Sequence, residues 1–142
     1  MSDIEIDIPE YAGTILLTAD NEIVLQLRDD NPAIVDPNCL SLFAGKMEKG
    51  ETPDQAVRRT LYEETTLRPK AFRYLFTFQT DKIRHGRIVK SHVYLVRSVV
   101  AADIDVHQGQ GYRIIRTAAD LELHDFALIS KDILRKYFDN NF

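Results

Sequence analysis

Three charged side chains follow one another at helical spacing near the middle of the chain. Arg59, Glu63 and Glu64 come shortly after a glycine-bearing loop. Residues three and four apart share a helix face, so Thr60, Glu63 and Glu64 are expected to point roughly the same way. Adjacent carboxylates repel each other unless a cation or a base lies between them. Because Mg²⁺ prefers oxygen ligands, this spacing points to a metal site.

A helix that begins near Pro53 would hold these side chains. Thr52 is a favourable N-cap, Pro53 suits the first helical position, and Gln55 completes a capping box with Thr52. The pattern predicts a helix from about Pro53 to Thr65, and Pro69 prevents it from continuing much further. Its buried stripe would consist of Ala56, Val57 and Leu61.

The segment GKMEKGETPDQAVRRTLYEETTL resembles the signature of the Nudix hydrolase (MutT-like) family. Seven positions fall on the spacing of that signature: Gly45, Glu51, Arg59, Leu61, Glu63, Glu64 and Leu67. The resemblance continues outside this box, because the runs Leu25 to Gly45 and Gly109 to Leu121 look like the segments that precede and follow it in many members. Together these segments cover most of the chain.

The resemblance implies both a fold and a reaction. The fold would be α+β, a Nudix-type α/β/α sandwich with a mixed β-sheet. The reaction would be hydrolysis of the phosphoanhydride in a nucleoside diphosphate linked to another moiety, with Mg²⁺ or Mn²⁺ as the cofactor. Glu63 and Glu64 would be the main metal ligands, together with the backbone carbonyl of Gly45. Arg59 would pair with Glu51 or Glu63, and Glu51 would support the site.

The chain departs from the family pattern at two positions in the box and one after it, which leaves three interpretations open. Thr60 stands where the family has a glutamate, and Gln108 stands where many members carry a late glutamate. The chain could therefore be a metal-dependent hydrolase, a catalytically weak nucleotide-binding protein, or a variant that cleaves the glycosyl bond of a GDP-sugar. Thr66 replaces a glycine that takes a positive φ in the family, so the helix is expected to end by another route.

Length and composition favour an ordinary globular protein. The 142 residues suit one domain, and the net charge of −4 argues against nucleic-acid binding by the whole surface. Cys39 is the only cysteine, which excludes an intrachain disulfide. The sequence shows neither a run of roughly 20 apolar residues nor a signal-peptide pattern, so a cytoplasmic location without a membrane partner is expected. A homodimer is possible, since dimers are common in the family.

Alternating apolar residues predict most of the other elements. Strands are expected over Asp3 to Ile8, Tyr11 to Thr18, Glu22 to Leu27, Leu40 to Phe43, Phe72 to Thr80, Ile88 to Val99 and Tyr112 to Ile115. The segment Asp81 to Arg87 would be a hairpin turn, with His85 either in a solvated tip or reaching the substrate. Thr117 would cap a short helix through Leu121, and Ser130 would cap a final helix from Lys131 to Phe138.

Overall fold

Seven strands form one mixed sheet in the computed structural model, which describes residues 8–140 and 142. The strands are β1 (Glu10–Leu17), β2 (Ile23–Leu27), β3 (Leu40–Ser41), β4 (Phe43–Lys46), β5 (Arg73–Gln79), β6 (Lys90–Val96) and β7 (Tyr112–Ile115). The helices are α1 (Pro53–Thr65), α2 (Lys82–His85) and α3 (Leu128–Asn140), with 3₁₀ turns at Ala101–Asp103 and Ala118–Glu122. The α+β class is as expected. The strand predicted over Asp3 to Ile8 lies outside the described residues except for Ile8.

Strand β1 is the centre of the sheet and contacts three other strands. It runs antiparallel to β4 along Tyr11 to Thr14 and antiparallel to β2 at its last two residues. On its other side it runs parallel to β6 over seven residue pairs, from Glu10 opposite Lys90 onward. This arrangement places β4, which carries Gly45, directly beside the middle of the sheet.

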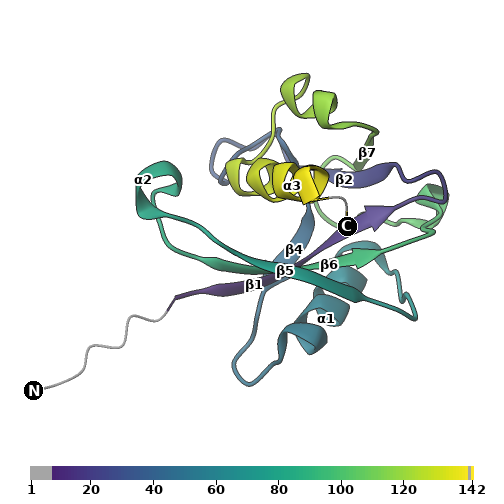
Figure 1. Cartoon of the computed structure of the whole chain (residues 1–142), viewed down its shortest axis with the longest axis horizontal. Helices are drawn as coiled ribbons and strands as arrows, with labels where there is room; N and C mark the ends of the chain where they lie inside the picture. Colours follow the sequence, from purple (N-terminus) through teal and green to yellow (C-terminus); the bar gives the residue numbers. More distant parts are fainter. Residues whose placement is uncertain (1–7, 141) are drawn as a thin grey trace, which may run out of the picture.

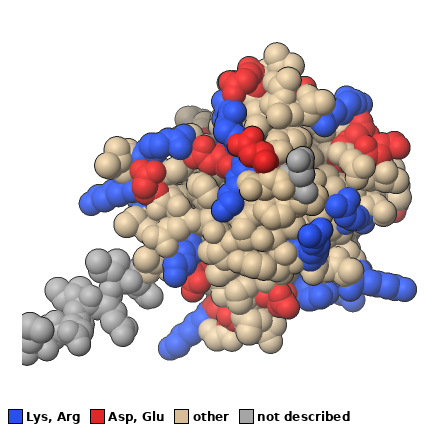
Figure 2. Space-filling model, viewed as in Figure 1, with Lys and Arg blue, Asp and Glu red and all other residues tan. Residues whose placement is uncertain are grey.

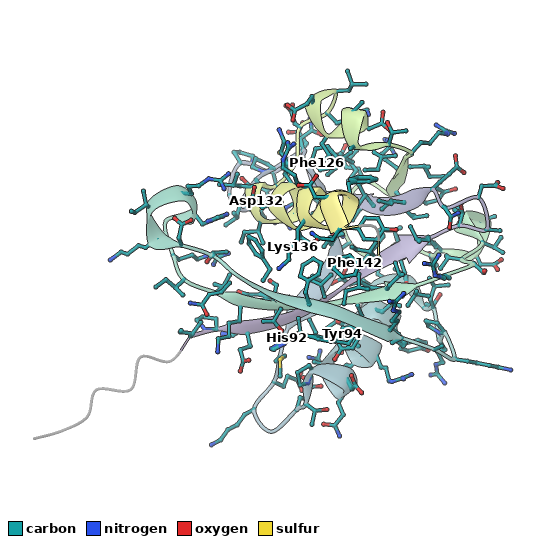
Figure 3. All side chains as sticks on the ribbon, viewed as in Figure 1. His92, Tyr94, Phe126, Asp132, Lys136 and Phe142 are labelled. Atoms are coloured by element: carbon teal, nitrogen blue, oxygen red, sulfur yellow. The ribbon has the colours of Figure 1, made fainter. Side chains whose placement is uncertain are left out.

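Two helices cover opposite faces of this sheet, with α1 below it and α3 above it in Figure 1. On the α3 side the core contains Leu25, Leu42 and Leu134, and on the α1 side it contains Leu16, Phe43 and Leu61. Figure 3 shows Lys136 and Phe142 between α3 and the strands, where the Lys136 ammonium lies 4.6 Å from the Phe76 ring centroid. The result is a three-layer arrangement of helix, sheet and helix.

Local hydrogen bonds define both ends of α1, the helix that carries the box residues Arg59, Glu63 and Glu64. Thr52 accepts a hydrogen bond from the Gln55 amide, and the Gln55 side chain accepts one from Thr52, which completes the predicted capping box. The prediction for its C-terminus was wrong, because Thr66 adopts the left-handed conformation with φ 61°. The Thr66 N–H donates to Tyr62 O at 2.8 Å, and the Thr65 hydroxyl donates to Leu61 O. These bonds offset the cost of a β-branched residue with positive φ.

The last helix begins earlier than its polar residues indicate. It starts at Leu128, so Ser130 is an interior residue and not the predicted N-cap. The Ser130 hydroxyl instead accepts a hydrogen bond of 3.1 Å from the Leu42 N–H. That bond also explains why the predicted strand Leu40 to Phe43 is interrupted. The residues before Leu42 pair with β2 and those after it pair with β1, and the Leu42 N–H between them bonds to a side chain.

The connection between β5 and β6 contains a short helix, where a hairpin turn was predicted. The two strands pair antiparallel as predicted, but α2 forms within the connection, with Asp81 as its N-cap. His85 is not solvated: its side chain is 2% exposed, and Nε2 lies 2.8 Å from Asp132 Oδ2 on α3. The α2 segment is therefore fixed to α3, near Asp132 in Figure 3. None of the helices within residues 8–140 is long and apolar enough to cross a membrane.

Candidate active site

Arg59 joins the loop before α1 to the helix itself. Its Nε and Nη2 donate to the two carboxylate oxygens of Glu51, each at 2.7 Å, and Nη1 donates to Glu63 Oε2 at 3.1 Å. Nη2 also donates to the Lys46 carbonyl at 3.0 Å. This paired hydrogen bonding lowers the pKa of Glu51 to about 2. The guanidinium thus holds together the end of β4, the loop and the middle of α1.

Glu64 is half-buried and stands apart from this ion-pair network. Its Oε2 is buried and has no hydrogen-bond partner among the described residues. Burial raises the pKa of the Glu64 carboxyl to about 8, and the neighbouring Glu63 carboxylate adds to the rise, while Arg28 opposes it. A carboxylate in this position is costly unless a cation approaches it. By contrast, the Glu63 side chain is 57% exposed.

The raised pKa of Glu64 predicts how stability depends on pH in metal-free protein. Between pH 4.5 and about 8 the unfolded chain loses the Glu64 proton while the folded protein keeps it. The folded state therefore binds more protons, and the free energy of unfolding contributed by Glu64 falls as pH rises through this range. Urea unfolding in EDTA should show this fall in the wild type relative to Glu64→Gln. Parallel pH profiles for the two proteins would contradict the prediction.

Close packing between β4 and α1 fixes the position of Gly45. A Cβ atom on Gly45 would lie 2.5 Å from Thr60 Cγ2 and 2.9 Å from Thr60 Cβ. Thr60 is 3% exposed, and its hydroxyl lies 3.4 Å from the Val57 carbonyl. Thr60, which stands where the family has a glutamate, therefore packs between β4 and α1, one turn before Glu64.

The opposite face of β4 lines a cavity of about 330 Å³. Side chains alternate along a strand, so Phe43 and Gly45 face α1 while Leu42 and Ala44 face the α3 side. Polar residues of four strands line the cavity, namely Tyr11, Gln26, Ser41 and Ser91. The other polar lining residues lie outside the strands: Arg28, Asp36, His85, Arg87 and Ser130. Its volume falls in the range of small-molecule sites. Arg28, which lines this cavity, lowers the pKa of Glu64, so the two charged groups lie within electrostatic reach of each other.

A family model described as NUDIX domain matches residues 8–137. The chain belongs to the Nudix hydrolase family.

This Nudix protein is similar in sequence to a known enzyme and similar in fold to solved Nudix structures. An ADP-ribose pyrophosphatase from Methanocaldococcus jannaschii is 30% identical over 97 residues, which are 68% of this chain and 54% of that protein. The chain thus spans about half the length of the relative. The NUDIX domain of Shewanella oneidensis NrtR, solved in complex with ADP ribose, has a TM-score of 0.75 at 16% identity and covers 97% and 91% of the two chains. A MutT protein from Methanosarcina mazei has a TM-score of 0.77 at 15% identity and covers 98% and 99%.

The Nudix box retains only part of the family's set of acids. Within residues 8–140 and 142, no group of three or more His, Cys, Asp and Glu side chains is placed to hold a metal ion. Two nearby acids pair with other side chains: Glu48 lies 3.7 Å from Arg59, and Asp105 lies 3.4 Å from His107. Glu63, Glu64 and the Gly45 carbonyl, the ligands expected from the sequence, would be the donors to a divalent ion. The buried, unpartnered Glu64 oxygen is the observation that supports such a fit.

The loop that carries Gln108 lies against the end of the Nudix helix. The His107 N–H donates to the Glu64 carbonyl at 3.0 Å, and His107 Nδ1 lies 2.7 Å from the Glu63 carbonyl. The Gln26 side chain donates to the Gln108 carbonyl at 2.9 Å. Sequence reasoning missed the cavity residues of β2 and β3. No motif or spacing marks Gln26 and Ser41, the lining residues of these two strands.

Proposed function

We propose that this protein is a metal-dependent Nudix pyrophosphohydrolase that cleaves a nucleoside diphosphate linked to another moiety. The observation that carries the proposal is the buried Oε2 atom of Glu64, which has no hydrogen-bond partner among the described residues. Glu64 lies beside Glu63 on a helix that Arg59 joins to the preceding loop. ADP-ribose is the first candidate substrate, because a curated relative is an ADP-ribose pyrophosphatase and a similar Nudix domain was solved with ADP ribose.

Glu63, Glu64 and the Gly45 carbonyl would hold Mg²⁺ or Mn²⁺, which neutralises phosphate charge and makes bound water more acidic. Arg59 keeps Glu63 and the loop at Lys46 in one place, so the carboxylates are positioned before substrate arrives. Lining residues of the cavity such as Gln26 and Ser41 offer hydrogen bonds to the nucleoside portion.

The test is turnover of a panel with Mg²⁺ or Mn²⁺. The panel contains ADP-ribose, nucleoside triphosphates, dinucleotides and nucleotide sugars, and the products are identified by chromatography. A hydrolase of the proposed kind releases a mononucleotide from ADP-ribose or another panel member, and EDTA stops the release. A free sugar and a nucleoside diphosphate would instead identify the glycosyl-cleaving variant.

A second candidate function is nucleotide binding without efficient turnover. Thr60 and the lack of a three-acid cluster within residues 8–140 and 142 favour it, because fewer negative charges weaken affinity for a divalent ion. Thermal stabilisation by one nucleotide, with no product from any member of the panel, would replace the first proposal with this one.

Restoring the missing acid separates the two candidates. Thr60→Glu is expected to lower stability without metal, because it brings a carboxylate to a buried position beside Gly45. It is also expected to increase metal affinity or activity, through a third carboxylate near Glu63 and Glu64. The readout is the shift in melting temperature with Mg²⁺ concentration, with Thr60→Gln as the uncharged control. A folded Thr60→Glu protein that matches Thr60→Gln in this shift and in rate would contradict the proposed metal set.

A further inference from the structure

A larger concavity lies away from the box. This groove of about 510 Å³ is formed by the loop after α1 (67–71), the beginning of β5, the end of β6 and the segment up to Asp103. Leu67, the last box position, lies at its edge, but none of the charged box residues Glu51, Arg59, Glu63 and Glu64 lines it, nor does Gly45. It lies on the side of the molecule where β5 begins and β6 ends, at the right in Figure 1. We call it the basic groove, after the Arg and Lys side chains that line it.

Four exposed cationic side chains line the basic groove: Arg68, Lys70, Arg73 and Arg97. Of the described residues that line it, Asp103 is the single acid. None of the four cations forms an ion pair within residues 8–140 and 142. Figure 2 shows Lys and Arg side chains gathered at the lower right, on this side of the molecule. The concentration is notable because the whole chain has a net charge of −4.

The groove also has an apolar floor. Leu95, Val96 and Val99 are buried beneath it, and Val100 is an exposed apolar side chain at its edge. One of its cations is already oriented, because the Arg68 guanidinium lies 4.2 Å from the centroid of the Tyr62 ring. A cationic rim over an apolar floor suits a ligand that has both an anionic and an apolar part.

We propose that the basic groove binds a small phosphorylated molecule, such as a nucleotide, at a site separate from the box. The phosphates would contact the Arg and Lys side chains, since guanidinium groups match phosphate oxygens in pairs. The apolar part would lie against Val99 and Val100. A multivalent anion would also relieve the repulsion among four neighbouring cations. An extended nucleic acid fits less well, because the negative charge of the remaining surface repels a long polyanion.

The test is calorimetric titration of the full chain with ATP in EDTA at low salt, where metal-dependent binding at the box is absent. Arg73→Gln/Arg97→Gln is expected to weaken ATP binding about tenfold or more. The matched control, Lys82→Gln/Arg113→Gln, removes two exposed positive charges elsewhere and should bind as the wild type does. Glu64→Gln should also bind ATP normally, which separates this proposal from the function proposed for the box.

Three results would overturn the proposal. They are no ATP binding by the wild type, an equal loss in both double variants, or a loss in Glu64→Gln as large as that in Arg73→Gln/Arg97→Gln. A single-stranded 12-nucleotide RNA that binds more tightly than ATP, and depends on Arg73 and Arg97, would make the groove a nucleic-acid site instead. Melting temperatures of all variants confirm that each is folded.

Discussion

Replacing Glu64 with glutamine is expected to reduce hydrolysis of the best substrate at least about 100-fold, the lower end of what a group acting on proton transfer contributes. The amide keeps the size of the side chain but loses the charge that would hold a cation and polarise the attacking water. Because Glu64 Oε2 has no partner among the described residues, no structural hydrogen bond is lost. The measurement is the initial rate at saturating Mg²⁺ and substrate, alongside the melting temperature.

Glu122→Gln is the matched control for this variant. Glu122 is an exposed glutamate that pairs with Arg135 on α3, far from the box in sequence and structure. The same chemical change there should leave the rate unaltered. A folded Glu64→Gln protein with wild-type activity would rule out the role assigned to Glu64, whatever the control shows.

Adding one methyl group at Gly45 is expected to produce the largest change in stability. The new Cβ in Gly45→Ala would overlap Thr60 Cγ2, 2.5 Å away, so β4 and α1 must separate. Overpacking of this kind costs about 1–3 kcal/mol in the free energy of unfolding. Activity should fall as well, because the Gly45 carbonyl and the Glu64 carboxylate would move apart. Urea denaturation and initial rates measure the two effects.

A double mutant tests whether the Thr60 methyl is the cause. Thr60→Ser removes Cγ2, so Gly45→Ala/Thr60→Ser should recover part of the stability lost in Gly45→Ala, although Thr60 Cβ remains 2.9 Å away. Thr60→Ser alone supplies the fourth corner of the cycle. If the double variant is no more stable than the sum of the single effects predicts, the contact is not the source of the cost.

Features set by neighbours in sequence were predictable, and those set by distant partners were not. The capping box of Thr52 and Gln55 spans three residues, and the Arg59 pairs span four and eight, so both follow from the sequence. Ser130 looks like a helix cap, but its partner is the amide of Leu42, 88 positions away. His85 looks like a turn residue, but Asp132 lies 47 positions later and buries it.

The candidate site shows the same division. The box residues lie on one helix and the loop before it, whereas the cavity beside them draws its lining from positions between 11 and 130. No spacing rule brings Tyr11, Ser41, Arg87 and Ser130 together before the sheet is known. The Thr66 prediction failed for a different reason, since two local hydrogen bonds compensated for an unfavourable backbone conformation.

The parallel pairing of β1 with β6 has a consequence for synthesis on the ribosome. The box is complete in the nascent chain at residue 67, but the central strand stays unpaired on one side until Lys90 to Val96 emerge. Closing a loop of this length costs entropy before any contact repays it, which slows folding. A fragment that stops before β6 would therefore contain the whole signature but lack the complete sheet on which α1 packs. The motif is short, but its assembly depends on most of the chain.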